Sequence, residues 1–288
     1  MLLCFVTCYK YPALSPDDQL LAGYLSKRGI IVSPAIWDDP AVNWQKFDGI
    51  VLRSMWDYHT KIHEFNIWLN KLEQLGGKVL NPIEVIRWNQ NKRYLVDLAA
   101  EGALVPPLQF CLKNSADTLA SVMKTNGWNK AVVKPAVSGG AYNTWKTGDT
   151  ETDDQRFAEM LLQGDVIVQK FMDEITTCGE ISLMFFNKKF SHAVLKRAQQ
   201  GDFRVQSEFG GSVEPVYPDE TVLTAAGKLL NDIAEPLLYA RVDGLVLNNN
   251  EFYLMELELI EPALFMRIDQ NACENFYEAL LTLRIKIN

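Results

Sequence analysis

The sequence predicts a mixed α/β fold, in which a small and mainly parallel N-terminal sheet precedes a longer α+β region. Strand-like and helix-like segments alternate over the first third of the 288 residues, a rhythm typical of βαβ units. Hairpin-like pairs of strands dominate the second half. The dipeptide Asn81-Pro82 interrupts the first pattern. We therefore predict an N-terminal domain over residues 1–88 and a second region over 89–288.

The N-terminal region contains the strands and the helices of an alternating βαβ pattern. Its expected strands are Leu2–Thr7, Ile30–Pro34, Gly49–Arg53 and Lys78–Leu80. The expected helices are Asp17–Arg28 and Glu64–Leu75. Each helix is followed by a glycine, a residue that readily takes the positive φ of a helix C-terminus. The region has no GxGxxG turn, so we expect no dinucleotide site there.

The region after the boundary begins with one expected helix, which runs from Ile83 across Lys92 to Ala100 before Gly102 and a Pro-Pro pair close it. A loop with small residues is expected at Ser138–Thr144. The remaining expected elements are a strand at Lys130–Pro135, a helix at Asp153–Leu162, a strand at Asp165–Phe171, a strand pair at Glu180–Phe186 and Phe190–Leu195, and a helix at Glu220–Leu238.

The composition excludes several classes of protein. The net charge is −8, which argues against a general nucleic-acid surface and against docking on an anionic membrane. No stretch approaches the roughly 20 apolar residues of a membrane span, and the N-terminus has no basic region ahead of its apolar run. Five scattered cysteines without a CxxC pair suit reduced thiols. We expect a cytoplasmic protein.

Two carboxylates lie inside an apolar run near the C-terminus, FYLMELELIEP. In a strand, Glu256 and Glu258 share one face, and the opposite face takes Tyr253, Met255, Leu257 and Leu259. A second strand-like run, LLYARVDGLVL, precedes it, and three asparagines, 248–250, separate the two runs.

The register of this hairpin decides which side chains meet. With an even-length turn centred on Asn249 and Asn250, Asp243 lies opposite Glu256, and Arg241 lies opposite Glu258. A three-residue loop would break that register. Carboxylates on one face are either a solvated surface or the ligands of a hard cation such as Mg²⁺, which is typically held by a few carboxylates together with phosphate oxygens. Three acids beside an arginine favour the cation site.

The segment AVVKPAVSGGAYNTW places Lys134 at the end of an apolar strand, just before Ser138, Gly139 and Gly140. Small residues let backbone N–H groups approach an anion, and the lysine adds a positive charge. Taken alone, the two glycines favour an ordinary flexible turn, and the P-loop pattern GxxxxGK[ST] is absent. Combined with a carboxylate clamp for Mg²⁺, the loop predicts a nucleoside triphosphate site.

The order of these motifs resembles the ATP-grasp superfamily: Lys92 on a helix, Lys134 in VVKP before the SGG loop, VQKFM, and RVD followed by MELELIEP. It is most similar to the glutathione-synthetase-like and ribosomal-modification-type branch. The segments RSMWDY, NPIEVIRWNQNKRYL, HAVLKR, GDFRVQSEFGG and YARVDG resemble the subgroup of cycloserine-forming cyclo-ligases. The resemblance covers nearly the whole chain. It implies a lid or central lobe over 89–172 and a C-terminal lobe over 173–288, which together enclose the nucleotide.

The resemblance also implies roles for single residues. The nucleotide would be bound by Lys92, Lys134, Ser138, Gly139, Gly140, Gln169, Lys170, Phe171, Met172 and Glu180. The magnesium ligands would be Asp243, Glu256 and Glu258. Residues facing the transferred phosphate would be Lys196, Arg204 and Arg241. The chain departs from the family pattern at Glu258, where most members have asparagine, and the extra charge should tighten Mg²⁺ binding.

The resemblance implies an ATP-dependent ligase that phosphorylates a small amino-acid-like carboxylate and lets an amine attack the acyl phosphate, with one or two Mg²⁺ ions for which Mn²⁺ can substitute. Such a reaction mainly requires that anions are positioned and developing charge is neutralised. Two alternatives stay open: a catalytically silent nucleotide-binding regulatory protein, and an ATP-grasp phosphotransferase. The expected partners are small carboxylates and amines, without nucleic acid or membrane. A homodimer is left open.

Two further groups of residues are weaker candidates. Arg53, Trp56, Asp57 and Tyr58 follow an N-terminal strand and suit either an acceptor-substrate site or a packed aromatic turn. His59 and His63 have a spacing that zinc can use in a helix, but without a third ligand a solvated helix start is the favoured interpretation. Arg204 suits either a surface loop or bidentate contact with an acyl phosphate, and we favour the second.

Overall fold

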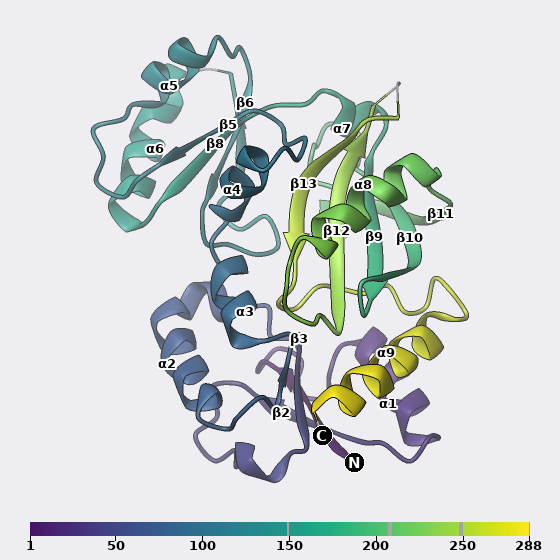
Figure 1. Cartoon of the computed structure of the whole chain (residues 1–288). Helices are drawn as coiled ribbons and strands as arrows, with labels where there is room; N and C mark the ends of the chain where they lie inside the picture. Colours follow the sequence, from purple (N-terminus) through teal and green to yellow (C-terminus); the bar gives the residue numbers. More distant parts are fainter. Residues whose placement is uncertain (149, 207–208, 248–249, 288) are drawn as a thin grey trace.

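The computed structural model describes the whole chain except residues 149, 207–208, 248–249 and 288. Its strands form three sheets, each with its own helices (Figure 1). The N-terminal sheet has the order β2-β1-β3-β4, and all its pairs are parallel, as predicted. Its strands are β1 (Leu2–Thr7), β2 (Ile31–Ile36), β3 (Gly49–Ser54) and β4 (Val79–Leu80).

Two helices accompany this sheet, α1 (Pro16–Ser26) and α2 (Ile62–Glu73), and two short 3₁₀ turns cover Trp44–Lys46 and Tyr58–Lys61. Helix α1 begins at Pro16 because Ser15 caps it and accepts a hydrogen bond from the Asp18 N–H. Helix α2 buries an apolar face through Phe65, Trp68 and Leu69.

The single helix predicted from Ile83 to Ala100 is wrong. The chain forms two helices instead, α3 (Ile83–Asn89) and α4 (Tyr94–Ala100). At the break, the Lys92 N–H donates to the Ala136 carbonyl at 2.8 Å, so a contact with a distant loop replaces a hydrogen bond within the helix. This break fixes the backbone of Lys92 beside the glycine loop.

The second sheet has the order β5-β8-β6-β7 (Figure 1, upper left). Its strands are β5 (Leu108–Cys111), β6 (Ala131–Pro135), β7 (Trp145–Thr147) and β8 (Val166–Lys170), and its helices are α5 (Leu119–Asn126) and α6 (Thr150–Gln163). Strands β5 and β7 and helix α5 were not predicted. Helix α5 is held by a capping box between Thr118 and Ser121 and ends at Gly127 in the left-handed conformation. We call this unit, residues 108–170, the lid.

The third sheet is antiparallel, with the order β11-β10-β9-β12-β13. Its strands are β9 (Glu180–Phe186), β10 (Lys189–Arg197), β11 (Ser212–Val216), β12 (Tyr239–Val246) and β13 (Phe252–Glu258). The helices after β8 are α7 (Glu174–Thr177), α8 (Glu220–Asn231) and α9 (Ala272–Ile287). Helix α8 ends at Asn231 rather than Leu238. Strand β11 and helix α9 were not predicted.

The predicted register at the acidic hairpin is confirmed, but a β-bulge produces it. Asp243 pairs with Glu256 and Arg241 with Glu258, whereas Gly244 pairs with Leu254, so Met255 has no partner across the ladder. Glycine is needed at 244 because a Cβ there would lie 2.4 Å from the Phe252 ring. Asn248 and Asn249 of the expected turn lie outside the described residues.

The bulge also overturns the predicted faces of β13. The extra residue shifts the alternation by one position, so Tyr253 and Met255 pack with Phe171 and Leu245 instead of joining the main core of the sheet. That core takes up Phe252, Leu254, Leu257 and Leu259. Met255 therefore lines the same cavity as Glu256 and Glu258, rather than the opposite face.

Most of the lid's hydrophobic core is separate from the rest of the molecule, although Leu108 and Val132 of the lid pack against clusters of the C-terminal unit. One cluster runs through β1 and β3, the third sheet and α9, so the N-terminal and C-terminal units share a core. The lid has a core of its own, which includes Val133, Phe157 and Val168. Polar contacts strengthen the shared boundary: the Asn81 side chain donates to the carbonyls of Tyr239 and Leu259 and accepts from the Leu238 N–H.

Candidate active site

A cavity of about 590 Å³ lies where the three sheets meet. It is lined by every candidate site residue that the sequence indicated, except Arg53 and His63. The sequence therefore predicted correctly which segments converge, although they come from strands as far apart as β6 and β13.

Arg53 does not face the cavity. It is 1% exposed, and its guanidinium forms an ion pair with Asp18 at 2.8 Å and donates to the Pro262 carbonyl at 3.0 Å. A buried charge of this kind requires its partners, so Arg53 links α1 to the segment after β13. Trp56, Asp57 and Tyr58 do line the cavity, but Tyr58 is largely buried and packs on Phe65. The expectation of a packed aromatic turn is thus right for Tyr58.

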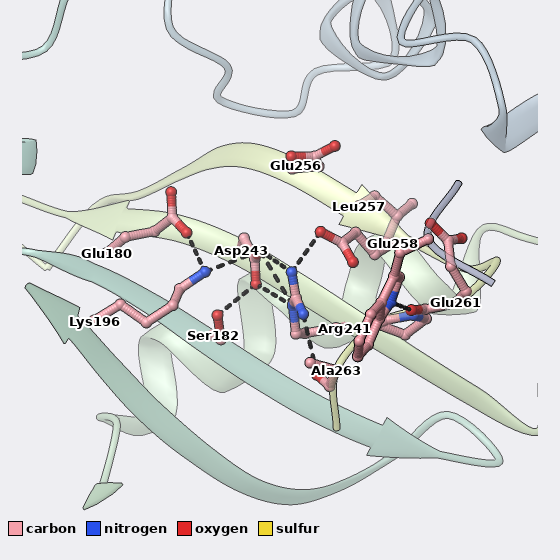
Figure 2. A network of polar contacts seen from close by, with 12 residues as sticks. Glu180, Ser182, Lys196, Arg241, Asp243, Glu256, Leu257, Glu258, Glu261 and Ala263 are labelled. Atoms are coloured by element: carbon pink, nitrogen blue, oxygen red, sulfur yellow. Dashed lines mark hydrogen bonds and ion pairs between the residues drawn. The ribbon is translucent and has the colours of Figure 1, made fainter. Parts of the chain in front are cut away.

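Asp243 is the centre of a buried network (Figure 2). Arg241 binds it in a bidentate manner, with its Nε 2.9 Å from Oδ1 and its Nη2 2.9 Å from Oδ2. Ser182 donates to Oδ1 at 2.6 Å, and the Lys196 ammonium lies 3.2 Å from Oδ2. Although burial opposes ionisation, Arg241 and Lys196 lower the pKa of Asp243 to about 2. The carboxylate stays charged throughout the physiological range.

The cations of this network are shared with neighbouring glutamates. Lys196 also forms an ion pair with Glu180, and Arg241 with Glu258. Burial raises the pKa of Glu180, despite Lys196. Burial also raises the pKa of Glu258 to about 7, which Glu256 and Asp243 reinforce and Arg241 opposes. Glu258 is therefore partly protonated near neutral pH, and a bound cation would favour its charged form.

Lys92 joins the glycine loop to the acidic strand. Its ammonium lies 2.7 Å from the Ser138 carbonyl and 3.1 Å from Glu256 Oε1. Burial raises the pKa of Glu256, but Lys92 and Lys134 outweigh it and lower the pKa overall. The Lys134 ammonium has no hydrogen bond or ion pair within the described ranges, and burial lowers its pKa to about 8. Lys134 is thus a cation available to a ligand.

The expected adenine hinge follows β8. The Lys170 N–H already donates to the Pro107 carbonyl at 2.8 Å, and the Phe171 N–H to the Lys130 carbonyl at 3.1 Å. Hydrogen bonds to adenine would therefore use other backbone groups of this hinge. The Phe171 ring lies 6.0 Å from the Phe203 ring in an edge-to-face arrangement, which gives the cavity an aromatic wall at this point.

Arg204 is held by its own loop. It binds Asp202 with two nitrogens, at 3.2 and 2.7 Å from Oδ2, and its guanidinium lies 3.7 Å from the centre of the Phe209 ring. The side chain is 32% exposed at the edge of the cavity. Contact with a substrate phosphate would require Arg204 to exchange its partner Asp202.

The carboxylate oxygens of Asp243, Glu256 and Glu258 are the donors that Mg²⁺ prefers. In the part of the chain that the structure describes, no three His, Cys, Asp or Glu side chains are grouped closely enough to hold a metal ion. Each of these carboxylates is paired with a lysine or arginine instead. The donor chemistry fits Mg²⁺, but the ligands are not preassembled, and a bound ion would displace some of these pairs.

Glu261 and His59 also line the cavity, although no role was predicted for Glu261 and His59 was considered only as part of a zinc pair. The His59 ring lies 5.3 Å from the Tyr142 ring and beside Gly139, whereas His63 does not line the cavity. Burial lowers the pKa of His59, and Lys92 adds to this. A zinc pair is therefore not formed. Glu261 was present in the acidic motif, but it falls outside the strand whose period drew attention to Glu256 and Glu258.

No helix among the described residues is long and apolar enough to span a bilayer. Residues 3–81 match the family of the N-terminal domain of D-cycloserine synthetase DcsG. Cycloserine biosynthesis protein DcsG from Streptomyces lavendulae is 28% identical over 269 residues, which cover 88% of each chain. The crystal structure of D-cycloserine synthetase DcsG superposes with a TM-score of 0.89 and 25% identity over the full length of both chains.

The chain has the fold of the ATP-grasp ligases. The same fold is found in D-alanine–D-alanine ligase from Bacillus anthracis complexed with ATP, with a TM-score of 0.69 and 18% identity over 99% of this chain and 98% of that one. The resemblance of the sequence motifs to ATP-grasp ligases is thus confirmed. The cavity of this chain lies between the lid and the third sheet.

Proposed function

We propose that this protein is an ATP- and Mg²⁺-dependent ligase that joins a carboxylate to an amine through an acyl phosphate. One observation supports this most directly: a single cavity contains an unpaired lysine, Lys134, beside the buried Arg241–Asp243–Lys196 network. The unpaired Lys134 ammonium suits the phosphates of ATP. Arg241 and Lys196, which are already paired, suit the negative charge that develops on the transferred phosphate during the reaction. The proposed domains are residues 1–88, 89–172 and 173–288.

In the proposed reaction, a substrate carboxylate oxygen attacks the γ-phosphorus of ATP, and the bond to the β-γ bridging oxygen breaks to release ADP. The amine nitrogen then attacks the acyl carbon, inorganic phosphate leaves, and the nitrogen loses a proton. Lys92 and Lys134 would hold the nucleotide phosphates, while Arg241 and Lys196 would face the transferred group. Mg²⁺, when bound, neutralises phosphate charge. No nucleophilic side chain is required.

The substrate class follows from the relatives. DcsG is named for cycloserine, and the Bacillus anthracis enzyme for the ligation of D-alanine. We propose a small amino-acid-like carboxylate for this chain. Two aromatic side chains of the N-terminal unit, Tyr11 and Trp56, line the same cavity, with their ring centres 5.0 Å apart.

The proposal is tested by ADP release over a panel of amino acids and their derivatives, with Mg²⁺ and with hydroxylamine in place of the amine. A ligase converts its true carboxylate into a hydroxamate, because hydroxylamine attacks the acyl phosphate. A stable phosphorylated product that resists hydroxylamine would indicate a phosphotransferase. ATP binding without ADP release from any carboxylate of the panel would favour the nucleotide-binding regulator.

A further inference from the structure

The segment that follows β13 has no regular secondary structure, yet its backbone is held at every residue. Six consecutive carbonyls, from Leu259 to Leu264, each accept a hydrogen bond from a side chain. The donors, in order, are Asn81, Tyr239, Trp56, Arg53, Arg241 and His192, at distances of 2.7 to 3.0 Å. The donors come from both the N-terminal and the C-terminal units. An irregular segment anchored in this way is rigid.

Glu261 is in the middle of this segment and lines the cavity (Figure 2). Its backbone carbonyl accepts the Trp56 indole N–H at 2.9 Å, but its carboxylate has no hydrogen bond or ion pair with any described residue. The neighbouring glutamates differ in this respect, because Glu256 pairs with Lys92 and Glu258 pairs with Arg241. A fixed carboxylate without a counter-charge is costly in a partly buried site, so a ligand is expected to supply that charge.

The surroundings of Glu261 indicate the kind of cation. Glu256 pairs with Lys92 and Glu258 with Arg241, so Glu261 offers a single unpaired carboxylate, whereas Mg²⁺ is typically held by several oxygen ligands. Trp56 lies on the same side of the cavity, with Tyr11 edge-on to it. A carboxylate near aromatic side chains suits an organic ammonium group, which gains an ion pair and can also contact a ring.

We propose that Glu261 binds the cationic amino group of the substrate and thereby selects amino acids over simple carboxylic acids. This inference rests on the proposed function, since it requires that the carboxylate of the same substrate is phosphorylated near Arg241. It assigns Trp56 as a positioning residue, which holds the Glu261 backbone through its indole N–H. Burial raises the pKa of Glu261 to about 8, assisted by Glu258 and opposed by Lys92, and an ammonium ligand would favour the charged form.

The test compares pairs of probes that differ only in the ammonium group: D- and L-serine against 3-hydroxypropionate, and D- and L-alanine against propionate. ADP release with hydroxylamine is measured for the wild type and for Glu261→Gln. The wild type should prefer the amino acid of a pair. In the variant, KM for that amino acid should rise about 10- to 100-fold, the effect of losing one charge-assisted hydrogen bond, while KM for the des-amino acid stays unchanged.

Controls separate recognition from folding and from catalysis. Glu261→Asp should recover part of the preference, and Glu84→Gln, an exposed carboxylate outside the cavity, should retain all of it. Trp56→Phe should raise KM in the same direction by a smaller factor. ATP affinity, measured by calorimetry, should be equal in the wild type and Glu261→Gln, which shows that the nucleotide site is intact.

Several outcomes would overturn the inference. An unchanged preference in Glu261→Gln would remove Glu261 from ammonium recognition. A fall in kcat with unchanged KM in Glu261→Gln would indicate that Glu261 accepts a proton instead. A changed Mg²⁺ requirement in this variant would indicate that Glu261 is a metal ligand. ADP release from the des-amino acids with the same KM as the amino acids would contradict the inference and leave the ligase function standing. No ADP release from any carboxylate in the wild type would overturn both.

Discussion

Lys92 and Glu256 form an ion pair across the cavity, 3.1 Å from Nζ to Oε1, and the same ammonium donates to the carbonyl of Ser138 in the glycine loop. The pair thus connects the predicted phosphate lysine to a predicted metal ligand. In the absence of a ligand each neutralises the other, and ATP with Mg²⁺ would satisfy both groups separately.

The first prediction concerns Glu256. Glu256→Gln should lower Mg²⁺-dependent ADP release by about 10² or more, because the amide supplies no charge for the metal or for Lys92. Thermal unfolding should remain cooperative. Glu214→Gln is the matched control, since Glu214 is an exposed carboxylate on β11 of the same sheet. Wild-type turnover in Glu256→Gln would exclude this residue from the metal site.

The second prediction concerns Lys134, whose ammonium is unpaired. Lys134→Ala should weaken ATP binding about 10- to 100-fold, the loss of one charge-assisted contact to phosphate. Because burial lowers the pKa of Lys134 to about 8, ATP affinity in the wild type should fall as the pH rises from 7 to 9. The variant should lose this part of the pH dependence. Equal affinities by calorimetry would place Lys134 outside the phosphate site, and exposed Lys189→Ala serves as control.

The third prediction concerns Arg204. If this residue faces the acyl phosphate, Arg204→Ala should reduce turnover by about 10² while ATP affinity changes little, because the contact is made mainly in the transition state. The Arg204 guanidinium forms an ion pair with Asp202. Asp202→Asn should therefore free Arg204, and it should reduce turnover less than Arg204→Ala does. Loss of ATP binding in Arg204→Ala would assign the residue to the nucleotide instead.

The fourth prediction concerns the β-bulge. Gly244→Ala should reduce the free energy of unfolding by about 1–3 kcal/mol, because the added Cβ would lie 2.4 Å from the Phe252 ring. Turnover should also fall, since the displaced strand carries Asp243 next to this position. Gly227→Ala in α8 is the opposite case: its Cβ meets nothing within 4 Å, and we expect a gain of about 0.4–1 kcal/mol. Urea denaturation distinguishes the two.

The fifth prediction concerns pH and stability. The pKa of Glu261 is raised to about 8 in the folded protein, from an ordinary value of 4.5. Between these values the folded state keeps a proton that the unfolded state has lost, so Glu261 lowers the free energy of unfolding as the pH rises from 5 to 8. Glu261→Gln should therefore gain stability relative to the wild type across this range. The same stability difference at pH 5 and pH 8 would contradict a raised pKa.

The sequence predicted the features that depend on residues close to one another along the chain. The parallel N-terminal strands followed from apolar runs and from glycines at helix ends, and the motif order led to the superfamily. The break between α3 and α4 was missed, because the Lys92 N–H finds its acceptor in Ala136, which is close only in the folded chain. The period of two in a strand correctly placed Glu256 and Glu258 on one face. It could not reveal the β-bulge at Met255, which moves the side chains before Glu256 to the other face of the sheet.

The role of Glu261 was equally hidden from local patterns. Its position depends on Trp56, which is 205 residues away in the chain, and on five other side chains that hold the neighbouring carbonyls. A sequence motif records the glutamate but not the groups that fix it. Arg53 shows the reverse, since a charged residue in a conspicuous motif is used for buried structure and never reaches the cavity.

The separate core of the lid has a consequence for how substrates enter and products leave. The N-terminal and C-terminal units share one core and the Asn81 contacts, so hinge motion between them would expose apolar surface. The lid loses far less when it swings away. If the proposed function is right, the contacts that hold Ser138 and Ala136 to Lys92 should be among those that open when ADP leaves. Amide hydrogen exchange should slow in residues 136–144 when nucleotide is bound, while the carbonyl-anchored segment around Glu261 remains protected in both states.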